Sequence, residues 1–535
     1  MDTLRDAPLG QLVRQFWTPN SLRYPEEKAG FEIPAGLKPK PVNEDIEKGS
    51  DNDQQSEGHA EKAAPDGVIL VDWYGADDPE NPQNFSVGKR AWITFVLFWM
   101  TFAVYGVSSM YTPSEQGVMQ AFGVGVPKAA LGLALYVLGA GLGPMLFSPL
   151  SEVPALGRNI PYIIPTTLFL ILSIPTAVVN NYSALMALRF LTGFVGSPAV
   201  GTGPASIQDI YPFHILPLGL TVWMIAAFTA PAFSPTLSAF AVMNEDWHWS
   251  LWVIVWITAP ALVLMWLALP ETSAPKILLR RAQRLRKLTG QKNFKSQSEI
   301  RQANLAVGSV LRDALLKPIE ISCLDPAIMF AHLYIMYIYG TYYSFFEAFP
   351  IVYAGSYGFN LGEVGLSFIP IAVGTFIGAG IFVLYMGMYV KPVYMKKGPQ
   401  PQEFNLIAGL YGSFALPVGL FIFAWTARAS IHWIVPMIGN AIFAGGAFLI
   451  FIAVFLYLPM SYPQYAASLF AANDLFRSCF AAGAVIFAHP MFVNLGIGKG
   501  VSVLGGLGVG GVIGIWLLWC FGAALRARSR FALSQ

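Results

Sequence analysis

The sequence predicts an all-α integral membrane protein with twelve transmembrane helices in two six-helix halves joined by a linker. Hydrophobic residues make up 55% of the 535 residues and charged residues only 12%, whereas a soluble domain carries roughly a quarter charged residues. Apolar runs of about 20 residues, each long enough to cross a bilayer as a helix, recur along the chain. Lys and Arg gather between particular runs, which indicates the side on which each connection lies.

The apolar runs fall into two groups of six. The first six spans are expected at residues 92–113, 128–150, 160–180, 184–208, 215–242 and 249–269. The second six are expected at 326–353, 363–388, 404–426, 432–459, 463–490 and 501–525. The chain therefore divides into an N-terminal tail (1–90), a first half (91–270), a linker (271–324), a second half (325–525) and a C-terminal tail (526–535).

The Lys and Arg distribution predicts that both termini are cytoplasmic. Of the 33 Lys and Arg residues, only Lys128, Arg428 and Lys499 fall on the outer side, and Arg189 and Arg477 lie within spans. Cytoplasmic segments carry the excess of these residues in membrane proteins. An odd number of spans would place the basic C-terminal tail outside, so twelve spans are favoured.

The polar segments show no sign of an enzyme. Residues 1–90 contain the low-complexity stretch EKGSDNDQQSEGHAEK, and most of this tail is expected to be disordered. The basic linker segment 276–287 is expected to form an amphipathic helix attracted to anionic lipid. The phosphate-binding pattern G-x-x-x-x-G-K-[ST] is absent from the sequence, which disfavours direct ATP driving. We expect no catalytic residues, no metal, no cofactor and no nucleic-acid partner.

The stretch SPLSEVPALGRN (148–159) interrupts two apolar runs. The approach to it carries Gly132, Tyr136, Gly139 and Gly143 on one helical face, a spacing that lets another helix come close. Pro149 is expected to end the span. Glu152 and Arg158 then bring opposite charges to the membrane boundary, where they form either a cytoplasmic latch or an ordinary capped, solvated loop.

The wider stretch GPMLFSPLSEVPALGRN (143–159) resembles the loop between spans 2 and 3 of the major facilitator superfamily. It is most similar to the fungal twelve-span drug:proton antiporters of the azole- and multidrug-resistance branch, with VPAL as an insertion between acid and arginine. Segments 72–86, 188–211, 269–290, 343–353 and 466–478 resemble motifs of the same family. The resemblance implies a cytoplasmic gate formed by Gly143, Pro149, Ser151, Glu152, Gly157 and Arg158.

Arg189 is a cation within span 4. Such a residue costs about 2.5–3.5 kcal/mol at the centre of a membrane helix and usually faces protein or water. Gly193 and Gly196 share its face and allow a neighbouring helix to approach. The alternative is an arginine that extends to the membrane interface. In the family that the sequence resembles, this arginine is implicated in proton coupling, so the resemblance implies that role for Arg189.

Span 5 contains AAFTAPAFSPTL, which is similar to a proline-glycine motif that marks exporters in the superfamily. Pro231 and Pro235 remain, whereas Ala230 and Ser234 stand in place of glycines. Prolines remove backbone hydrogen bonds and are expected to loosen the helix locally. A proline-containing helix without any role in export is the alternative.

Span 7 combines a carboxyl group with aromatic residues. Glu347 shares a helical face with Tyr343 and Met336, with Tyr339 at its margin and Phe346 beside it. Burial disfavours the charged form of a carboxyl group, so Glu347 is a candidate proton carrier, and carboxylate and rings together can attract organic cations. We expect Tyr136, Tyr339, Tyr343, Phe346 and Met336 to line a substrate cavity. Helix packing and a polar residue near the outer mouth are the alternatives.

Asp474 and Arg477 lie three residues apart in span 11 and can pair on one helical face. We expect this pair to stabilise the second half rather than to bind substrate.

These features lead to a functional expectation. The resemblance implies a monomeric plasma-membrane protein with the major facilitator fold, which exports diverse hydrophobic or cationic small molecules in exchange for protons by alternating access. The proton gradient, rather than a cofactor, would supply the energy. A dedicated exporter of one endogenous toxin is an alternative, and a proton-coupled nutrient importer is another.

Overall fold

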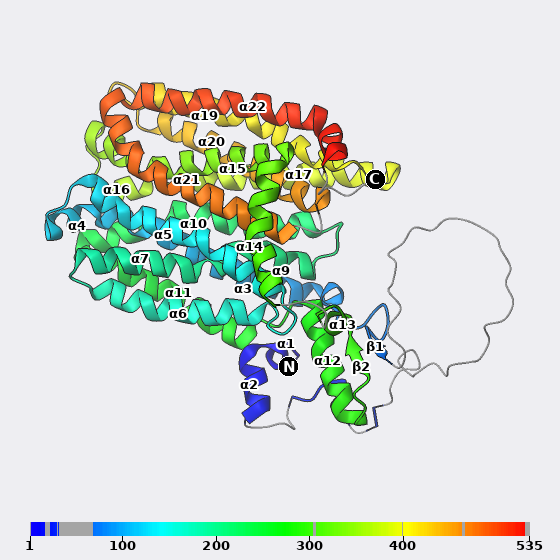
Figure 1. The fold of residues 1–535 in the computed structure, drawn as a ribbon. Helices are drawn as coiled ribbons and strands as arrows, with labels where there is room; N and C mark the ends of the chain where they lie inside the picture. The colour runs from blue at the N-terminus through cyan, green and yellow to red at the C-terminus, as the bar shows by residue number, and fades with distance from the viewer. Residues whose placement is uncertain are drawn as a thin grey trace.

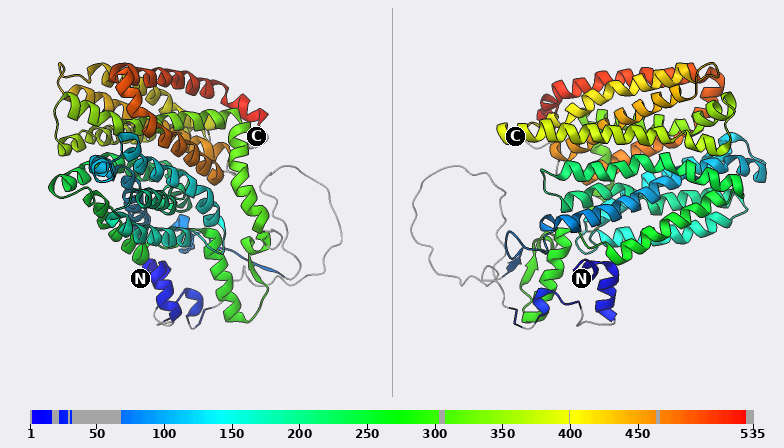
Figure 2. Two further views of the ribbon diagram at one scale, coloured as in Figure 1. Left: turned by 60° about the vertical axis from the view of Figure 1, so that its left-hand side comes forward. Right: turned by 180° about the vertical axis from the view of Figure 1, so that it is seen from behind.

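The computed structural model describes residues 2–16, 22–28, 30–31, 68–302, 307–398, 400–462 and 466–529. Long helices run side by side and form two groups, one above the other in Figure 1. The described parts of both chain ends and the linker lie at one end of the bundle, which we call the terminal face (Figures 1 and 2). The other end, which carries α4 and α16, is called the opposite face.

The first half contains six spans. Their helices are α3 (Val87–Met110), α5 (Val126–Glu152), α6 (Asn159–Val178), α7 (Tyr182–Gly196) with its continuations α8 (Pro198–Gly201) and α9 (Gly203–Ile210), α10 (Leu216–Asn244) and α11 (Trp249–Ala268). The short helix α4 (Glu115–Phe122) extends the first span at the opposite face. The fourth span is divided next to Pro198 and Pro204, whose rings cannot supply a helical N–H.

The second half mirrors this arrangement. Its helices are α15 (Pro326–Phe349) with a π-helical turn (Pro350–Ser356), α17 (Ile369–Tyr385) with its extension α18 (Lys391–Lys397), α19 (Ile407–Thr426), α20 (Ile434–Ser461), α21 (Ala466–Leu495) and α22 (Ile497–Arg528). The short helix α16 (Leu361–Leu366) precedes α17. Within the described ranges, eleven helices are long and apolar enough to cross a membrane, and the count is twelve when the bent pair α14–α15 is taken as one span. The predicted all-α membrane fold is confirmed.

The linker is largely helical. It contains α12 (Ala274–Thr289), β2 (Phe294–Ser296), α13 (Gln297–Gln302) and α14 (Val307–Leu324). Helix α14 crosses from the first half to the second at a steep angle to the spans (Figure 1). The chain then bends by 101° into the seventh span. Asp325 fixes this bend because it caps α15 through the N–H groups of Ala327 and Ile328 and accepts a hydrogen bond from the Tyr462 hydroxyl at 2.8 Å.

Part of the N-terminal tail folds against α12, contrary to the prediction of a largely disordered tail. Helices α1 (Asp2–Asp6) and α2 (Pro8–Phe16) lie near α11, and β1 (Ile69–Val71) pairs in parallel with β2. Residues 32–67 lie outside the described residues. The described parts of the tail pack against α12 because their carboxylates pair with its arginines.

Two arginines of α12, the buried Arg281 and the partly buried Arg284, bind the tail. Arg281 is 1% exposed and contacts Asp78 (Nη1–Oδ2 2.6 Å) and Glu26. Arg284 contacts Glu26 and Glu80 at 3.2 and 2.9 Å. These two guanidinium groups therefore face tail carboxylates, and not the lipid that was predicted to attract this helix.

Acidification is expected to release residues 68–86 from α12. Burial alone would raise the pKa of Glu26 and of Asp78, but Arg284 beside Glu26 and Arg281 beside Asp78 outweigh it and hold both pKa values below their ordinary range. Such carboxyls stabilise the folded state above the unfolded pKa of about 4, and this contribution is lost as the pH falls through the lower folded value. Docking should thus be constant near neutrality and weaken below about pH 4.

Hydrogen exchange can measure this release at the amides of Tyr74 and Glu80, which donate to the Asp78 carboxylate at 2.9 Å each. The variant Asp78→Asn should show low protection of these amides already at neutral pH. Full protection of both amides in the acidified wild-type protein would contradict the expectation.

Candidate functional site

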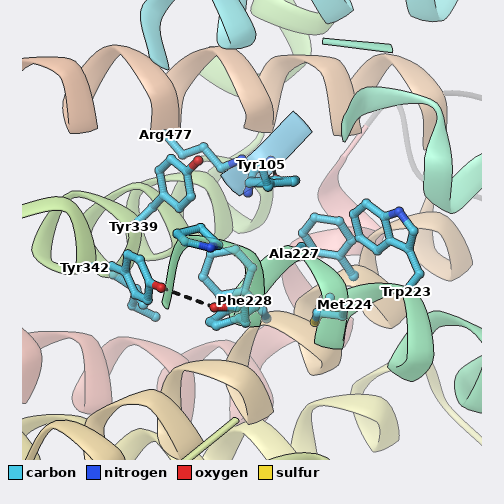
Figure 3. A pocket seen from close by; sticks show the side chains of 12 residues that line it. Tyr105, Trp223, Met224, Ala227, Phe228, Tyr339, Tyr342 and Arg477 are labelled. Carbon is cyan, nitrogen blue, oxygen red and sulfur yellow. Dashed lines mark hydrogen bonds between the residues drawn. The ribbon is translucent and has the colours of Figure 1, made fainter. Parts of the chain in front are cut away.

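A small cavity lined by residues of both halves, which we call the central cavity, is shown in Figure 3. Its lining comes from α3, α10, α15, α20 and α21: Tyr105, Trp223, Met224, Ala227, Phe228, Pro231, Ile338, Tyr339, Tyr342, Phe451, Phe455 and Arg477. The volume is about 20 Å³, which is room for roughly one water molecule. The halves are therefore closed against each other at this level, and aromatic rings fill most of the space.

Arg477 lines this cavity and forms an ion pair with Asp474. Both side chains are buried, and the Arg477 guanidinium donates to the Asp474 carboxylate. The same nitrogen of Arg477 donates to the Tyr105 hydroxyl of α3 at 2.7 Å, and the guanidinium lies 4.7 Å from the centre of the Tyr339 ring. The predicted ion pair is present, and its arginine also contacts the first half and lines the cavity.

A second small cavity adjoins the first and contains three of the predicted substrate residues. Tyr136, Tyr339 and Tyr343 line it together with Arg477. The Tyr343 hydroxyl lies 2.9 Å from that of Ser108, which links α15 to α3. The other two predicted residues lie elsewhere: the Phe346 ring stacks on Phe368, 5.0 Å between centres, and the half-buried Met336 is absent from the lining of either central cavity.

Arg189 is completely buried and ties three helices of the first half together. Its Nε donates to the Gly132 carbonyl of α5 at 2.9 Å, and Nη2 donates to the Val107 and Ser108 carbonyls of α3 at 3.3 Å each. The guanidinium lies between the rings of Tyr111 and Tyr136, 5.0 and 4.7 Å from their centres. Arg189 therefore faces protein, as predicted, and does not extend to the membrane interface.

The proline motif of span 5 connects the central cavity with the opposite face. Pro231 lines the central cavity, and Pro235 lines a larger cavity nearer the opposite face. Ser234 is fully buried against Gly106 of α3, where a side chain on that glycine would collide with the Ser234 hydroxyl. The prolines were expected to loosen the helix locally. In the structure α10 continues through both of them without a break.

The larger cavity has a volume of about 450 Å³ and contains Glu347, the predicted proton carrier. Glu115 of α4 lies in the same lining, and so does His489 of α21. Sequence reasoning missed Glu115 because it lies just beyond the expected end of span 1 at residue 113. The sequence did offer a signal for Glu115: it lies about one helical turn after the apolar run, two residues after the proline of YTPSE.

At the terminal face, Arg158, one of the predicted gate residues, binds Asp209 and Ser151. The Arg158 Nε donates to Asp209 Oδ2 at 3.0 Å, and its Nη1 donates to the Ser151 hydroxyl at 2.8 Å. Arg158 forms its ion pair with Asp209, and Glu152 is exposed, so of the two alternatives for this stretch the structure shows no direct Glu152–Arg158 latch among the described contacts. The insertion VPAL leads the chain away from Glu152 and towards the end of span 4. Helix α5 continues through Pro149 to Glu152, three residues beyond the predicted end.

Two glycines of this region allow close contacts. A side chain at Gly143 would collide with Ser197 of the fourth span, as the predicted helix approach requires. Gly157 has φ +71°, and a Cβ there would lie 2.5 Å from Glu271 Oε2. Glu271 itself accepts the Arg158 backbone N–H through Oε1 at 2.9 Å, which joins this loop to the end of the sixth span.

The variant Gly157→Ala is expected to lower the thermal stability more than Gly123→Ala. Gly123 has φ +63° with no neighbour within 4 Å of an added Cβ, so alanine there carries only the left-handed backbone cost of about 1–2 kcal/mol. Alanine at 157 carries the same cost and also displaces Glu271. Thermal unfolding of the purified variants measures the difference, and equal midpoints would contradict it.

A cavity of about 880 Å³ opens near the terminal face, between α9 and α10 of the first half and α18 and α20 of the second. The structure thus has a narrow centre with larger spaces nearer each face. Two six-helix halves around a central site are the arrangement of a membrane transporter that exposes the site to each side in turn.

The chain belongs to the Major Facilitator Superfamily, whose family model matches residues 97–481. It is therefore a transporter of small molecules rather than an enzyme. It is similar to the proton:xylose symporter XylE, with a TM-score of 0.58 and 15% identity over 82% of this chain and 96% of XylE. That likeness supports the fold alone.

Fungal relatives match most of the chain. The MFS-type transporter pyvG of Aspergillus violaceofuscus is 44% identical over 87% of this chain and 86% of its own length. The multidrug transporter FLR2 of Candida glabrata is 38% identical over 90% and 82%, respectively. Fluconazole resistance protein 1 of Saccharomyces cerevisiae is 36% identical over 95% and 91%.

Proposed function

We propose that this chain is a proton-coupled exporter of structurally diverse hydrophobic and cationic small molecules. The observation that carries the proposal is its similarity, over nearly the whole length, to proteins named for multidrug and fluconazole resistance. The central site is consistent with such substrates, because aromatic rings offer apolar contact and the faces of Tyr and Trp attract cations.

The transport cycle would alternate between two states. Separation of the halves at the terminal face would admit substrate to the central site, and separation at the opposite face would release it. The contacts Arg477–Tyr105 and Tyr343–Ser108 join the halves across this site and would break and re-form in each cycle. Glu347 would carry the proton, and Arg189 would transmit its charge change through the carbonyl groups of α3 and α5.

The proton gradient would supply the energy without a cofactor. Each charge moved across the membrane yields about 2.3 kcal/mol per 100 mV. We propose that both termini are cytoplasmic, because Lys and Arg are concentrated in the tails and the linker. We further propose a monomer in the plasma membrane, the location in which a drug exporter would act.

Expression in a drug-sensitive yeast that lacks its own pumps tests this function. Cells with the transporter should accumulate less of some compounds in a panel of antifungal drugs and dyes, and collapse of the proton gradient should abolish the difference. The variant Tyr105→Phe removes only the hydroxyl that Arg477 contacts. It therefore serves as a conservative change in the central site, to be compared with the wild type in the same assay. Unchanged accumulation across the panel, or substrate uptake, would refute the proposal.

A further inference from the structure

The cavity near the opposite face brings together two carboxyl groups from different halves. Glu115 belongs to α4 in the first half, and Glu347 belongs to α15 in the second. Helix α4 lies at the opposite face in Figure 1. Glu347 is 4% exposed, and both residues have a buried carboxyl oxygen, Oε1, for which the structure provides no hydrogen-bond partner.

The two carboxyl groups act on each other electrostatically. Two like charges in a buried site disfavour each other unless a cation lies between them or one group is protonated. Two carboxyl groups that line one cavity, each with an unpartnered oxygen, therefore form a site that a positively charged occupant or a proton would stabilise.

Among the described residues, no Lys or Arg lines this cavity. Arg189 acts electrostatically on Glu115, but its Nε and Nη2 donate to backbone carbonyls and its guanidinium lies over the Tyr111 ring, whereas Nη1 is buried without a hydrogen-bond partner. His489 is the other titratable group in the lining. The elements that complete the wall, α10, α16 and the π-helical turn after α15, contribute Pro235, Val364, Pro350 and other uncharged residues.

The size and the remaining lining define the occupant. A volume of about 450 Å³ lies within the range of pockets that hold small organic molecules, about 300–1,000 Å³. Phe359 and Phe368 place two aromatic rings in the wall, and Met119 and Ile351 add apolar surface. A metal ion would find two carboxyls in a large apolar space, whereas an ammonium or phosphonium ion with apolar groups matches both features.

We propose that Glu115 and Glu347 form a binding site for an organic monocation in this cavity, separate from the central site. The inference rests on the proposed export function, for which it would be the last site before release. A proton that enters from the opposite face would neutralise one carboxyl and expel the cation. Because the two carboxyls belong to different halves, separation of the halves would also take the site apart.

Binding to the purified full-length protein in lipid nanodiscs tests the proposal. The probe is tetraphenylphosphonium, and triphenylphosphine oxide serves as its uncharged analogue of similar shape. The wild-type protein should prefer the cation, and Glu115→Gln or Glu347→Gln should each weaken cation binding by about tenfold or more with little effect on the analogue. Glu115→Asp should retain the preference. Glu245→Gln, an exposed acid at the same face, is the matched control.

The pH dependence of binding distinguishes a role of the two carboxyl groups from a role of His489, which lines the same cavity. Lowering the pH from about 8 to about 5 should weaken binding to the wild-type protein and to His489→Ala, whereas the double variant of Glu115 and Glu347 should bind weakly at every pH. Cation binding of wild-type strength in both single variants would overturn the inference. So would equal loss of cation and analogue, which would indicate a structural role.

The inference and the export function fail in different ways. Cation binding without any change in cellular drug accumulation would refute the exporter and leave the site. Export of uncharged drugs by a protein that does not prefer the cation would refute the site and leave the exporter.

Discussion

The variant Asp474→Asn is expected to abolish transport and to lower stability strongly. It leaves the Arg477 guanidinium buried in the wall of the central cavity without its counter-charge. Removal of one partner from a buried ion pair typically costs about 3–5 kcal/mol. The remaining guanidinium contacts, to the Tyr105 hydroxyl and the Tyr339 ring, carry no negative charge.

A double variant distinguishes the missing charge from a missing side chain. Asp474→Asn combined with Arg477→Gln removes both charges and keeps hydrogen-bonding groups at both positions. Its thermal midpoint should lie above that of Asp474→Asn alone, while transport stays low because the contact with Tyr105 is weakened. Stability and transport of Asp474→Asn equal to those of the wild type would show that the pair contributes to neither.

The variant Arg189→Lys is expected to lose most transport although it keeps the positive charge. Arginine presents several N–H groups in a fixed plane, whereas lysine is a compact charge on a flexible stem. A lysine cannot donate at once to Gly132 on α5 and to Val107 and Ser108 on α3. The buried carbonyls that lose a partner each carry a penalty of about 1–3 kcal/mol.

Comparison of Arg189→Lys with Arg189→Ala separates geometry from charge. If the planar group is what matters, both variants should show the same loss of drug efflux at equal amounts of protein in the membrane. If the charge alone matters, the lysine variant should keep the pH dependence of efflux. Full transport by the alanine variant would refute any coupling role for Arg189.

The sequence predicts the spans well because each is set by local composition. A run of apolar residues must form a helix wherever it crosses a membrane, whatever it contacts. Arg189 was predicted to face protein or water because a cation inside an apolar run is costly to expose to lipid. The partners of Arg189 are backbone carbonyls, which every residue has, so no sequence pattern identifies them.

Contacts between distant segments were predicted less well. A pair between Arg158 and Glu152, six residues away, was one of two alternatives, but the ion pair of Arg158 is with Asp209, at the end of the fourth span. Glu115 and Glu347 line one cavity although they belong to different halves, and α4, which carries Glu115, lies at the opposite face (Figure 1). The tail was expected to be disordered from its composition, although its carboxylates match arginines some 200 residues further along, a match that composition does not reveal.

The two short strands carry a consequence for biogenesis. β1 precedes the first span and β2 follows the sixth, yet they pair side by side. During synthesis the tail therefore has no strand partner until all six spans of the first half have left the ribosome. The sheet and the Arg281–Asp78 contact can therefore form only after the first half has been synthesised, when the segment that follows the sixth span packs against the segment that precedes the first span.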